Sequence, residues 1–226
     1  QYGYWRTRMV YSMIIGYMVY YFTRKIVSCM VPYLRQELGY SKAQIGLMIS
    51  ALALTYAFSK FASGLMSDRS NPRYFMSFGL IMTGVCSICI GFTDSLYLLV
   101  LLAAINGIFQ GFGWPPCSKQ LTHWFAKSER GTWWSITAMS HNVGAMLIPI
   151  ISVYIAMYID WHYSFIVVGW IAIGTGIFLI DRLRDTPESL GLPSIEDFKQ
   201  EPAIVKSQDT GKHLSFYKNI SRKYFN

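Results

Sequence analysis

Apolar residues gather along the chain in six long runs that are separated by short polar segments. A membrane-spanning helix needs about 20 predominantly apolar residues, and each run approaches or exceeds that length. Because the connections are short, we expect neighbouring helices to run antiparallel and to pack together. The six predicted spans cover residues 9–31, 45–66, 74–92, 96–116, 132–158 and 163–180.

The pattern changes after the sixth run. Residues 182–226 are polar, carry prolines and charges of both signs, and contain no catalytic motif. The sequence therefore predicts a six-helix transmembrane domain over residues 1–181, followed by a cytoplasmic loop or tail. The sequence starts at Gln1, and its last residues do not open a seventh span. We expect from this that the chain is a fragment or a truncated product of a longer protein.

Composition supports a membrane protein. Hydrophobic residues make up 53% and charged residues only 14% of the chain, whereas an average soluble protein is about 25% charged. The net charge of +8 first suggests a nucleic-acid partner, but the basic residues form short clusters between apolar runs, as membrane topology requires. We therefore expect a lipid bilayer and no nucleic acid around this chain.

Lysines and arginines near the span ends predict the orientation, because cytoplasmic loops are enriched in them. Only Arg35 and Lys42 lie on one side of the six spans. The predicted location is a cell inner membrane, with the chain start and the tail in the cytoplasm. The other side carries Arg6, Arg8, Arg69, Arg73, Lys127, Arg130, Arg182 and Arg184.

The cysteines give no sign of redox or metal chemistry. Cys86 and Cys89 form a C-x-x-C pair, but their surroundings are those of a helix core and there is no second pair. Cys29 and Cys117 also lie in or beside apolar runs. We find no nucleophile beside a base and no metal cluster, so we expect no cofactor and a membrane enzyme is disfavoured.

Charged residues inside the first span indicate a functional site. Arg24 and Lys25 lie about two-thirds of the way along it, where an unpaired charge costs several kcal/mol. Such residues face a polar cavity as a rule, and the alternative for both Arg24 and Lys25 is that the side chain reaches a membrane interface. Tyr17, Tyr21 and Arg24 follow an i, i+4, i+7 spacing and so share one helix face. A guanidinium binds phosphate as a planar, bidentate fork.

Other polar residues within the spans add to the candidate site. Lys60 lies one turn after Tyr56 in the second span, and His141 lies near the middle of the fifth. Gln110 and Trp114 are further candidates in the fourth span. No carboxylate lies in the middle of any span. This arrangement predicts a positive interior that selects an anion, and it disfavours a proton pump or a cation channel.

Small residues and prolines mark the fourth span. Gly107, Gly111 and Gly113 are spaced for close helix contact. Pro115 and Pro116 follow them and should end or kink this helix near the cytoplasmic face.

The segment "GLMSDRSNPR" at residues 64–73 resembles the signature loop of the major facilitator superfamily. The pattern is Gly-x-x-x-Asp-Arg-x-x-x-Arg, in the predicted turn between the second and third spans. The resemblance implies a structural role for Gly64, Asp68, Arg69 and Arg73, in which Asp68 and the arginines bridge helix ends and bias gating.

Further segments resemble the organophosphate:phosphate antiporters of that superfamily. They include "GYMVYYFTRK", "FQGFGWPPCSK", "ERGTWWS" and "SHNVGAMLIPI", and the resemblance runs from about Tyr4 to Pro193. It implies a fold of two six-helix halves, of which this chain is the first, and an exchange of phosphate esters for inorganic phosphate. Substrate or pore roles are implied for Tyr17, Tyr21, Arg24, Lys25, Tyr56, Lys60, Gln110, Trp114 and His141, with Arg24 binding phosphate.

Two segments, "GTWWS" and "RLRDTPESLGLP", are most similar to the hexose-phosphate branch of the family. Thr137 stands where members that carry glycerol 3-phosphate have a tryptophan, which argues against glycerol 3-phosphate. The hexose-phosphate branch also contains a membrane sensor. Two functions thus stay open: exchange of a sugar phosphate for inorganic phosphate by alternating access, or sensing of external hexose phosphate together with a sensor kinase. The resemblance also implies a C-terminal half, missing from this sequence, that supplies a partner arginine.

Overall fold

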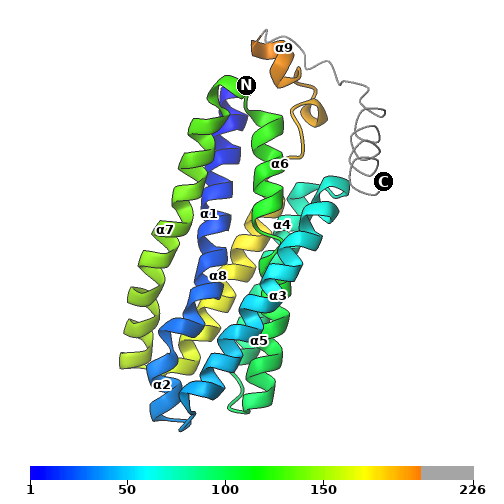
Figure 1. The fold of residues 1–226 in the computed structure, drawn as a ribbon. Helices are drawn as coiled ribbons and strands as arrows, with labels where there is room; N and C mark the ends of the chain where they lie inside the picture. The colour runs from blue at the N-terminus through cyan, green and yellow to red at the C-terminus, as the bar shows by residue number, and fades with distance from the viewer. Residues whose placement is uncertain (200–226) are drawn as a thin grey trace, which may run out of the picture.

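The chain is helical, with no strand, over residues 1–199, which are the residues that the computed structural model describes (Figure 1). Long helices run side by side along one direction and short elements close their ends. In chain order the elements are α1 (Tyr2–Cys29), α2 (Val31–Gln36), α3 (Lys42–Arg69), α4 (Pro72–Ile90), α5 (Leu96–Gln110), α6 (Trp114–Trp124), α7 (Lys127–Tyr158), α8 (Trp161–Arg182), η1 (Glu188–Leu190) and α9 (Ile195–Lys199).

Five helical segments of the described chain are long and apolar enough to cross a membrane. They are α3, α4, α5 together with α6, α7 and α8. The first predicted span forms α1, which is as long as α3 at 28 residues. It falls outside this group because its four basic residues and six tyrosines lower its hydropathy. α1 tolerates these polar groups because it packs against α7 and α8 inside the bundle.

Side-chain caps explain where three of the helices begin. Ser41 and Gln44 form a capping box before α3: the Ser41 hydroxyl accepts from the Gln44 N–H at 3.3 Å, and the Gln44 amide accepts from the Ser41 N–H at 2.8 Å. At the start of α4 the Asn71 side-chain oxygen accepts from the Arg73 N–H, and at the start of α8 the Asp160 carboxylate accepts from the His162 N–H. Each cap satisfies a backbone donor that a helix leaves unpaired at its start.

The helical segment that contains the fourth predicted span covers Leu96–Trp124, and its interruption lies near its middle rather than near one face. α5 stops at Gln110 and α6 resumes at Trp114 and continues to Trp124, eight residues past the predicted end. Pro115 and Pro116 cause the break, because neither can donate to the carbonyl four residues before it. One of the freed carbonyls, that of Gly111, accepts a hydrogen bond from Ser63 of α3 at 2.7 Å.

Glycines allow the closest helix pairs to form. A Cβ on Gly84 of α4 would lie 2.7 Å from the carbonyl oxygen of Gly169 on α8, and the reverse is equally close. A Cβ on Gly107 or Gly111 of the fourth span would collide with the backbone of α3, as the sequence predicted for packing glycines. A Cβ on Gly144 of α7 would likewise lie 2.7 Å from a backbone carbonyl oxygen of α1. Small residues of this kind let helix backbones approach within a membrane.

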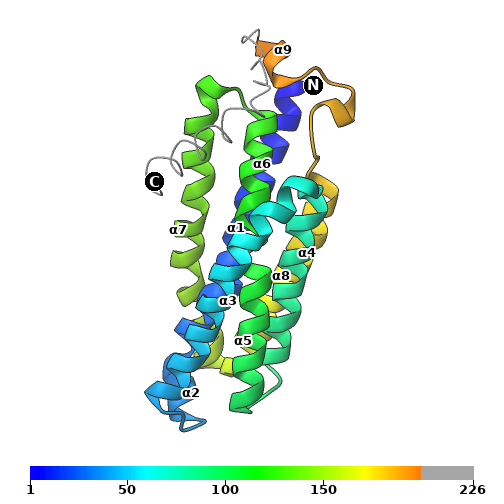
Figure 2. The same cartoon turned by 45° about the vertical axis from the view of Figure 1, so that its right-hand side comes forward.

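All eight basic residues of the more positive side lie at one end of the bundle, which we name the basic end. The chain start, the α3–α4 turn, the α6–α7 turn and the end of α8 meet there, at the top of Figure 1. α2 and the α7–α8 turn lie at the opposite end (Figure 2). The basic residues thus gather in space as the topology prediction requires.

The segment after α8 folds back over the basic end. Phe198 of α9 stacks on Tyr2 with ring centroids 4.2 Å apart. Lys199 lies 3.7 Å from Glu129 at the start of α7, and Glu129 also pairs with Arg6 of α1. The predicted loop or tail over residues 182–226 is thus placed as far as residue 199, and the remainder lies outside the described residues.

The contact between α4 and α8 generates a stability prediction. Gly169→Val should lower the melting temperature of the purified protein, because the new side chain collides with the backbone of α4 and overpacking of this kind costs about 1–3 kcal/mol. Gly174→Val is the matched control on the same helix, since a Cβ at Gly174 has no atom within 4 Å. Equal melting temperatures for the two variants would contradict the packing argument.

Candidate functional site

Arg24 projects from α1 into the interior of the bundle, where it is half-buried. Its guanidinium carbon lies 4.0 Å from the centroid of the Tyr56 ring on α3 and 4.8 Å from that of Tyr21. Its Nε donates a hydrogen bond to the Gln110 side-chain oxygen at 3.2 Å. Within residues 1–199, its two terminal nitrogens have no hydrogen-bond acceptor. Cation–π contacts hold the charge in place, and the fork stays available to a ligand.

Gln110 is itself fixed by buried polar neighbours. Its amide nitrogen donates to the Thr23 hydroxyl at 2.8 Å and to the Asn106 side-chain oxygen at 3.3 Å. The Asn106 amide in turn donates to the Thr23 carbonyl at 3.3 Å. These contacts leave the Gln110 oxygen directed at Arg24. The sequence analysis missed Thr23 and Asn106, although an asparagine one turn before Gln110 in an apolar span was a usable signal.

An aromatic wall continues from Arg24 across three helices. Tyr17 and Tyr21 of α1 pack edge to face at 5.6 Å, and Tyr17 lies 5.0 Å from Trp114 at the start of α6. Tyr21 lies 5.2 Å from the ring of His141 on α7. Trp134 of α7 packs against Trp114 at 5.3 Å and was not predicted. The wall exists because the break between Gln110 and Trp114 starts a new helix at Trp114, whose ring packs against Tyr17 of α1.

The two candidate lysines lie at the edges of this region, and both are exposed. Lys60 of α3 has its ammonium 5.7 Å from the Tyr56 ring. Lys25 lines a pocket of about 180 Å³ between α1 and α3, together with Arg24 and Tyr56. The nine predicted binding residues thus lie in one connected region. Tyr17, Tyr21, Arg24, Tyr56, Gln110, Trp114 and His141 form its continuous centre.

Carboxylates are absent from the surroundings of Arg24. α1, α5 and α6 contain no Asp or Glu, and the acidic residues of α3, α7 and α8 lie in their first or last turns. No group of three potential ligands for a metal ion is present in the described chain. The charge of Arg24 is therefore balanced by no fixed anion in residues 1–199, which makes the region attractive to a soluble one.

A larger hollow at the end opposite the basic end has different chemistry. It measures about 490 Å³ and is lined by Asp94, Asp160 and His162 among others. Burial raises the pKa of Asp160, but the hydrogen bonds that Asp160 accepts from the backbone and ring of His162 outweigh this effect and lower the pKa below its ordinary value. An ionised carboxylate disfavours phosphate there, so the hollow is not the anion site.

The signature loop differs in part from the expected bridge. Arg73 donates from Nε to the Ile180 carbonyl and so links α4 to the end of α8. Asp68 and Arg69 are exposed and form no ion pair within residues 1–199. Lys119 of α6, which the sequence analysis missed, binds the end of α3 by donating to three carbonyls, including those of Ser67 at 3.1 Å and Ser70 at 2.8 Å.

The comparison with family models decides the superfamily. The model described as Major Facilitator Superfamily matches residues 13–221. The chain belongs to this superfamily. It is therefore a multi-pass membrane protein of a transporter family, and the predicted all-helical fold is confirmed. A crystal structure of a bacterial homologue of the human lysosomal transporter Spinster, inward-facing and unoccupied, has the same fold, with a TM-score of 0.72 at 20% identity over 81% of this chain and 44% of that one.

Relatives confirm the resemblance to organophosphate transporters. A probable hexose phosphate transport protein of Chlamydia pneumoniae is 54% identical over 202 residues, which cover 89% of this chain and 44% of the relative. The membrane sensor protein UhpC of Salmonella typhimurium is 42% identical over 224 residues, which cover 99% of this chain and 50% of the relative. The chain spans about half the length of the curated relatives it matches.

From the polar residues around Arg24 we predict a water-accessible cavity on one face of the bundle. In a cysteine-free variant of the intact protein, Tyr56→Cys and His141→Cys should react with a membrane-impermeant thiol reagent, because both positions border the polar region around Arg24. Trp170→Cys is the control, since Trp170 is 62% exposed on α8 but lies on an apolar face. Labelling of Trp170→Cys as fast as the other two would contradict the assignment of the cavity.

Proposed function

We propose that this chain forms the first half of a membrane transporter that exchanges a hexose phosphate for inorganic phosphate. The observation that carries the proposal is Arg24, a guanidinium in the bundle interior whose terminal nitrogens have no acceptor in residues 1–199. A phosphate group supplies two adjacent anionic oxygens that match this fork. The name of the Chlamydia relative supports a hexose phosphate as the ester.

The other residues have distinct roles in the proposed mechanism. Tyr17 and Tyr21 present phenol groups on the face of α1 that carries Arg24, and Lys25 and Lys60 add positive charge at its edges. Trp114 and His141 form an apolar and aromatic wall against which the sugar can lie, since ligand sites combine such walls with a few polar anchors. Gln110 orients Arg24 and does not itself need to contact the ligand.

Transport follows from alternating access of two halves. The half-length match to the relatives supports a second six-helix half that faces the cavity and contributes a second cation. Rocking of the halves about a midplane site opens it to either side. A phosphate ester and inorganic phosphate share the group that Arg24 binds. Either one can therefore occupy the site while its opening switches from one side of the membrane to the other. Inward movement of one and outward movement of the other produce exchange. In this proposal residues 1–181 form the transmembrane half and residues 182–226 the loop between halves.

A sensor of external hexose phosphate is the second candidate. The relative named membrane sensor protein favours it, and the same residues would bind the ligand. A sensor would signal through a partner, for which a sensor kinase is the candidate. Exchange of labelled phosphate by the intact protein in reconstituted vesicles separates the two, because a sensor needs to bind the ester but not to move it.

The proposed orientation places the basic end in the cytoplasm, with the protein in a cell inner membrane. A cysteine at Asp160, in the turn between α7 and α8, should then react with an impermeant reagent added outside the cell. A cysteine at Ser70, in the turn between α3 and α4, is the control and should react only after the membrane is opened. The reverse pattern would show that the positive-inside argument fails for this protein.

Arg24→Lys should weaken binding of glucose 6-phosphate by the intact protein. Lysine keeps the charge but loses the planar fork. A hydrogen bond to a charged group contributes about 1.5–3 kcal/mol, and its loss corresponds to a roughly tenfold to hundredfold higher Kd. The measurement is a binding isotherm on purified protein.

Arg35→Lys is the matched control, because Arg35 is exposed at the end of the bundle opposite the basic end. It should leave the dissociation constant unchanged. If Arg24→Lys also leaves it unchanged, Arg24 does not bind the phosphate group and the proposal loses its main support.

A further inference from the structure

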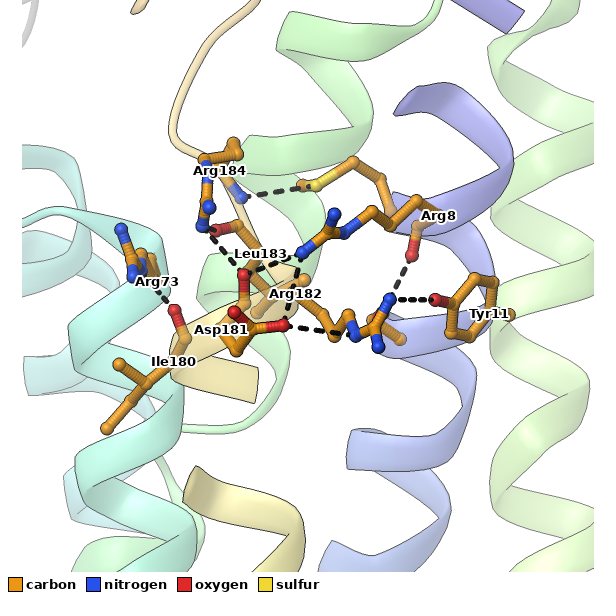
Figure 3. A network of polar contacts seen from close by, with 10 residues as sticks. Arg8, Tyr11, Arg73, Ile180, Asp181, Arg182, Leu183 and Arg184 are labelled. Atoms are coloured by element: carbon orange, nitrogen blue, oxygen red, sulfur yellow. Dashed lines mark hydrogen bonds and ion pairs between the residues drawn. The ribbon is translucent and has the colours of Figure 1, made fainter. Parts of the chain in front are cut away.

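Four arginines from three helices meet at the basic end, away from Arg24. Figure 3 shows Arg8 of α1, Arg73 of α4, and Arg182 and Arg184 at and just beyond the end of α8, all directed at the last residues of α8. We name these four residues the arginine cluster. None of them takes part in the site proposed above.

Part of the arginine cluster caps α8. Arg73 donates to the Ile180 carbonyl, and Arg8 and Arg184 donate to the Asp181 carbonyl at 3.0 and 2.8 Å. The last carbonyls of a helix have no partner within the helix and carry a partial negative charge. One or two donors from each arginine are sufficient for this role, although each guanidinium has five.

The positive charge exceeds what the capping role needs. The Asp181 carboxylate pairs with Arg8 at 3.2 Å and with Arg182 at 3.1 Å. Within residues 1–199 Asp181 is the one carboxylate that pairs with these four guanidinium groups, and the helix end adds only about half a negative charge. The pKa of Arg184 is lowered by its burial and by the charges of Arg73 and Arg8, so the arginines repel one another.

Several donors of the cluster also lack acceptors. Nε of Arg8 is buried and has no hydrogen-bond partner, and the Arg8 side chain is only 13% exposed. Arg73 uses only its Nε within residues 1–199. A buried donor without an acceptor costs about 1–3 kcal/mol, and an anion bound between the arginines would remove that cost.

The position of the cluster identifies the source of the anion. α4 and α8 pack against each other and contribute no residue to the site around Arg24, and Figure 2 shows them side by side. Their outer faces expose Tyr74, Phe78, Trp170 and Ile177 by 51–62%. Exposed apolar side chains on transmembrane helices contact lipid tails, so the end of this face lies at the depth of lipid headgroups.

Aromatic residues support that depth. The guanidinium groups of Arg8 and Arg184 lie 4.9 and 5.6 Å from the ring centroid of Trp5, and the Tyr11 hydroxyl accepts from Arg182 at 3.4 Å. Tryptophan and tyrosine gather at the membrane–water interface. Clusters of basic residues beside transmembrane helices attract anionic lipids.

We propose that the arginine cluster binds the phosphodiester headgroup of an anionic phospholipid between the ends of α1, α4 and α8. The phosphate oxygens accept from the unpaired guanidinium donors, and the acyl chains lie along the outer faces of α4 and α8. The bound lipid ties these three helix ends together and neutralises the excess charge. This lipid site is independent of the transported ligand, and it holds for a transporter and for a sensor alike.

The test compares lipids of different headgroup charge. Native mass spectrometry of the intact protein in a neutral detergent, titrated with phosphatidylglycerol or phosphatidylcholine, reports the dissociation constant of each bound lipid. Phosphatidylglycerol should bind at least tenfold more tightly, since phosphatidylcholine carries no net charge. Equal affinities for the two lipids would overturn the proposal.

Variants place the lipid. Arg73→Gln together with Arg182→Gln keeps a donor at each position and removes two charges, and it should weaken phosphatidylglycerol binding by about tenfold to a hundredfold. Arg69→Gln together with Arg130→Gln removes two charges from the same end outside the arginine cluster and should change binding by less than threefold. Equal losses in both double variants would show only a diffuse attraction and would contradict a built site.

Two further measurements address a variant that fails to fold and competition by free phosphate. If the glutamine variant does not fold, as judged by size exclusion and melting temperature, Arg73→Lys with Arg182→Lys replaces it, and loss of the planar fork should still weaken binding by at least threefold. An unchanged affinity in that variant would refute the proposed contact between the guanidinium groups and the lipid phosphate. Inorganic phosphate at 100-fold excess over the lipid should not displace it, and complete displacement would reassign the cluster to a free phosphate ion.

Discussion

A guanidinium held inside an apolar bundle is the constraint around which the rest of the structure is arranged. A charge placed within a membrane span is costly, and three helices share the compensation for Arg24 through Tyr21, Tyr56 and Gln110. Tyr56 of α3 and Gln110 of α5 lie on two helices whose backbones approach closely at Gly107 and Gly111. A larger residue at position 107 would collide with the α3 backbone beside Tyr56, so helix packing and the chemistry of the site are linked.

The same coupling appears where the fourth span breaks. In a membrane, every backbone polar group needs a partner within the protein. Pro115 and Pro116 remove two helix bonds, and Ser63 of α3 compensates for one of them by donating to the Gly111 carbonyl. Ser59 of α3 also donates to the Ile108 carbonyl just before the break. The interruption is thus stabilised from α3, and it is what starts a new helix at Trp114, 5.0 Å from Tyr17.

Sequence reasoning predicted the helices well because apolar runs and membrane thickness leave little freedom. It also brought the candidate residues of α1 together, because i, i+4 spacing defines a helix face. It placed the break of the fourth span too near one face. The prolines show which helix bonds are lost, but they do not show how many helical residues follow the break. It missed Thr23, Asn106 and Lys119, whose roles depend on which helices are neighbours, and hydropathy does not contain that information.

The two arginine sites differ in what holds the guanidinium, and this difference fits the two proposed ligands. Arg24 is held mainly by aromatic faces, which attract the cation but accept no hydrogen bond, so a phosphate can arrive and leave without breaking an ion pair. Arg8, Arg73 and Arg184 are fixed by carbonyl groups of α8, which keep the donors in place whether or not an anion is bound. A transported ligand must be released in every cycle, whereas a structural lipid is retained. In these two proposals, charge alone does not distinguish the transport site from the lipid site, whereas the groups that position the arginines do.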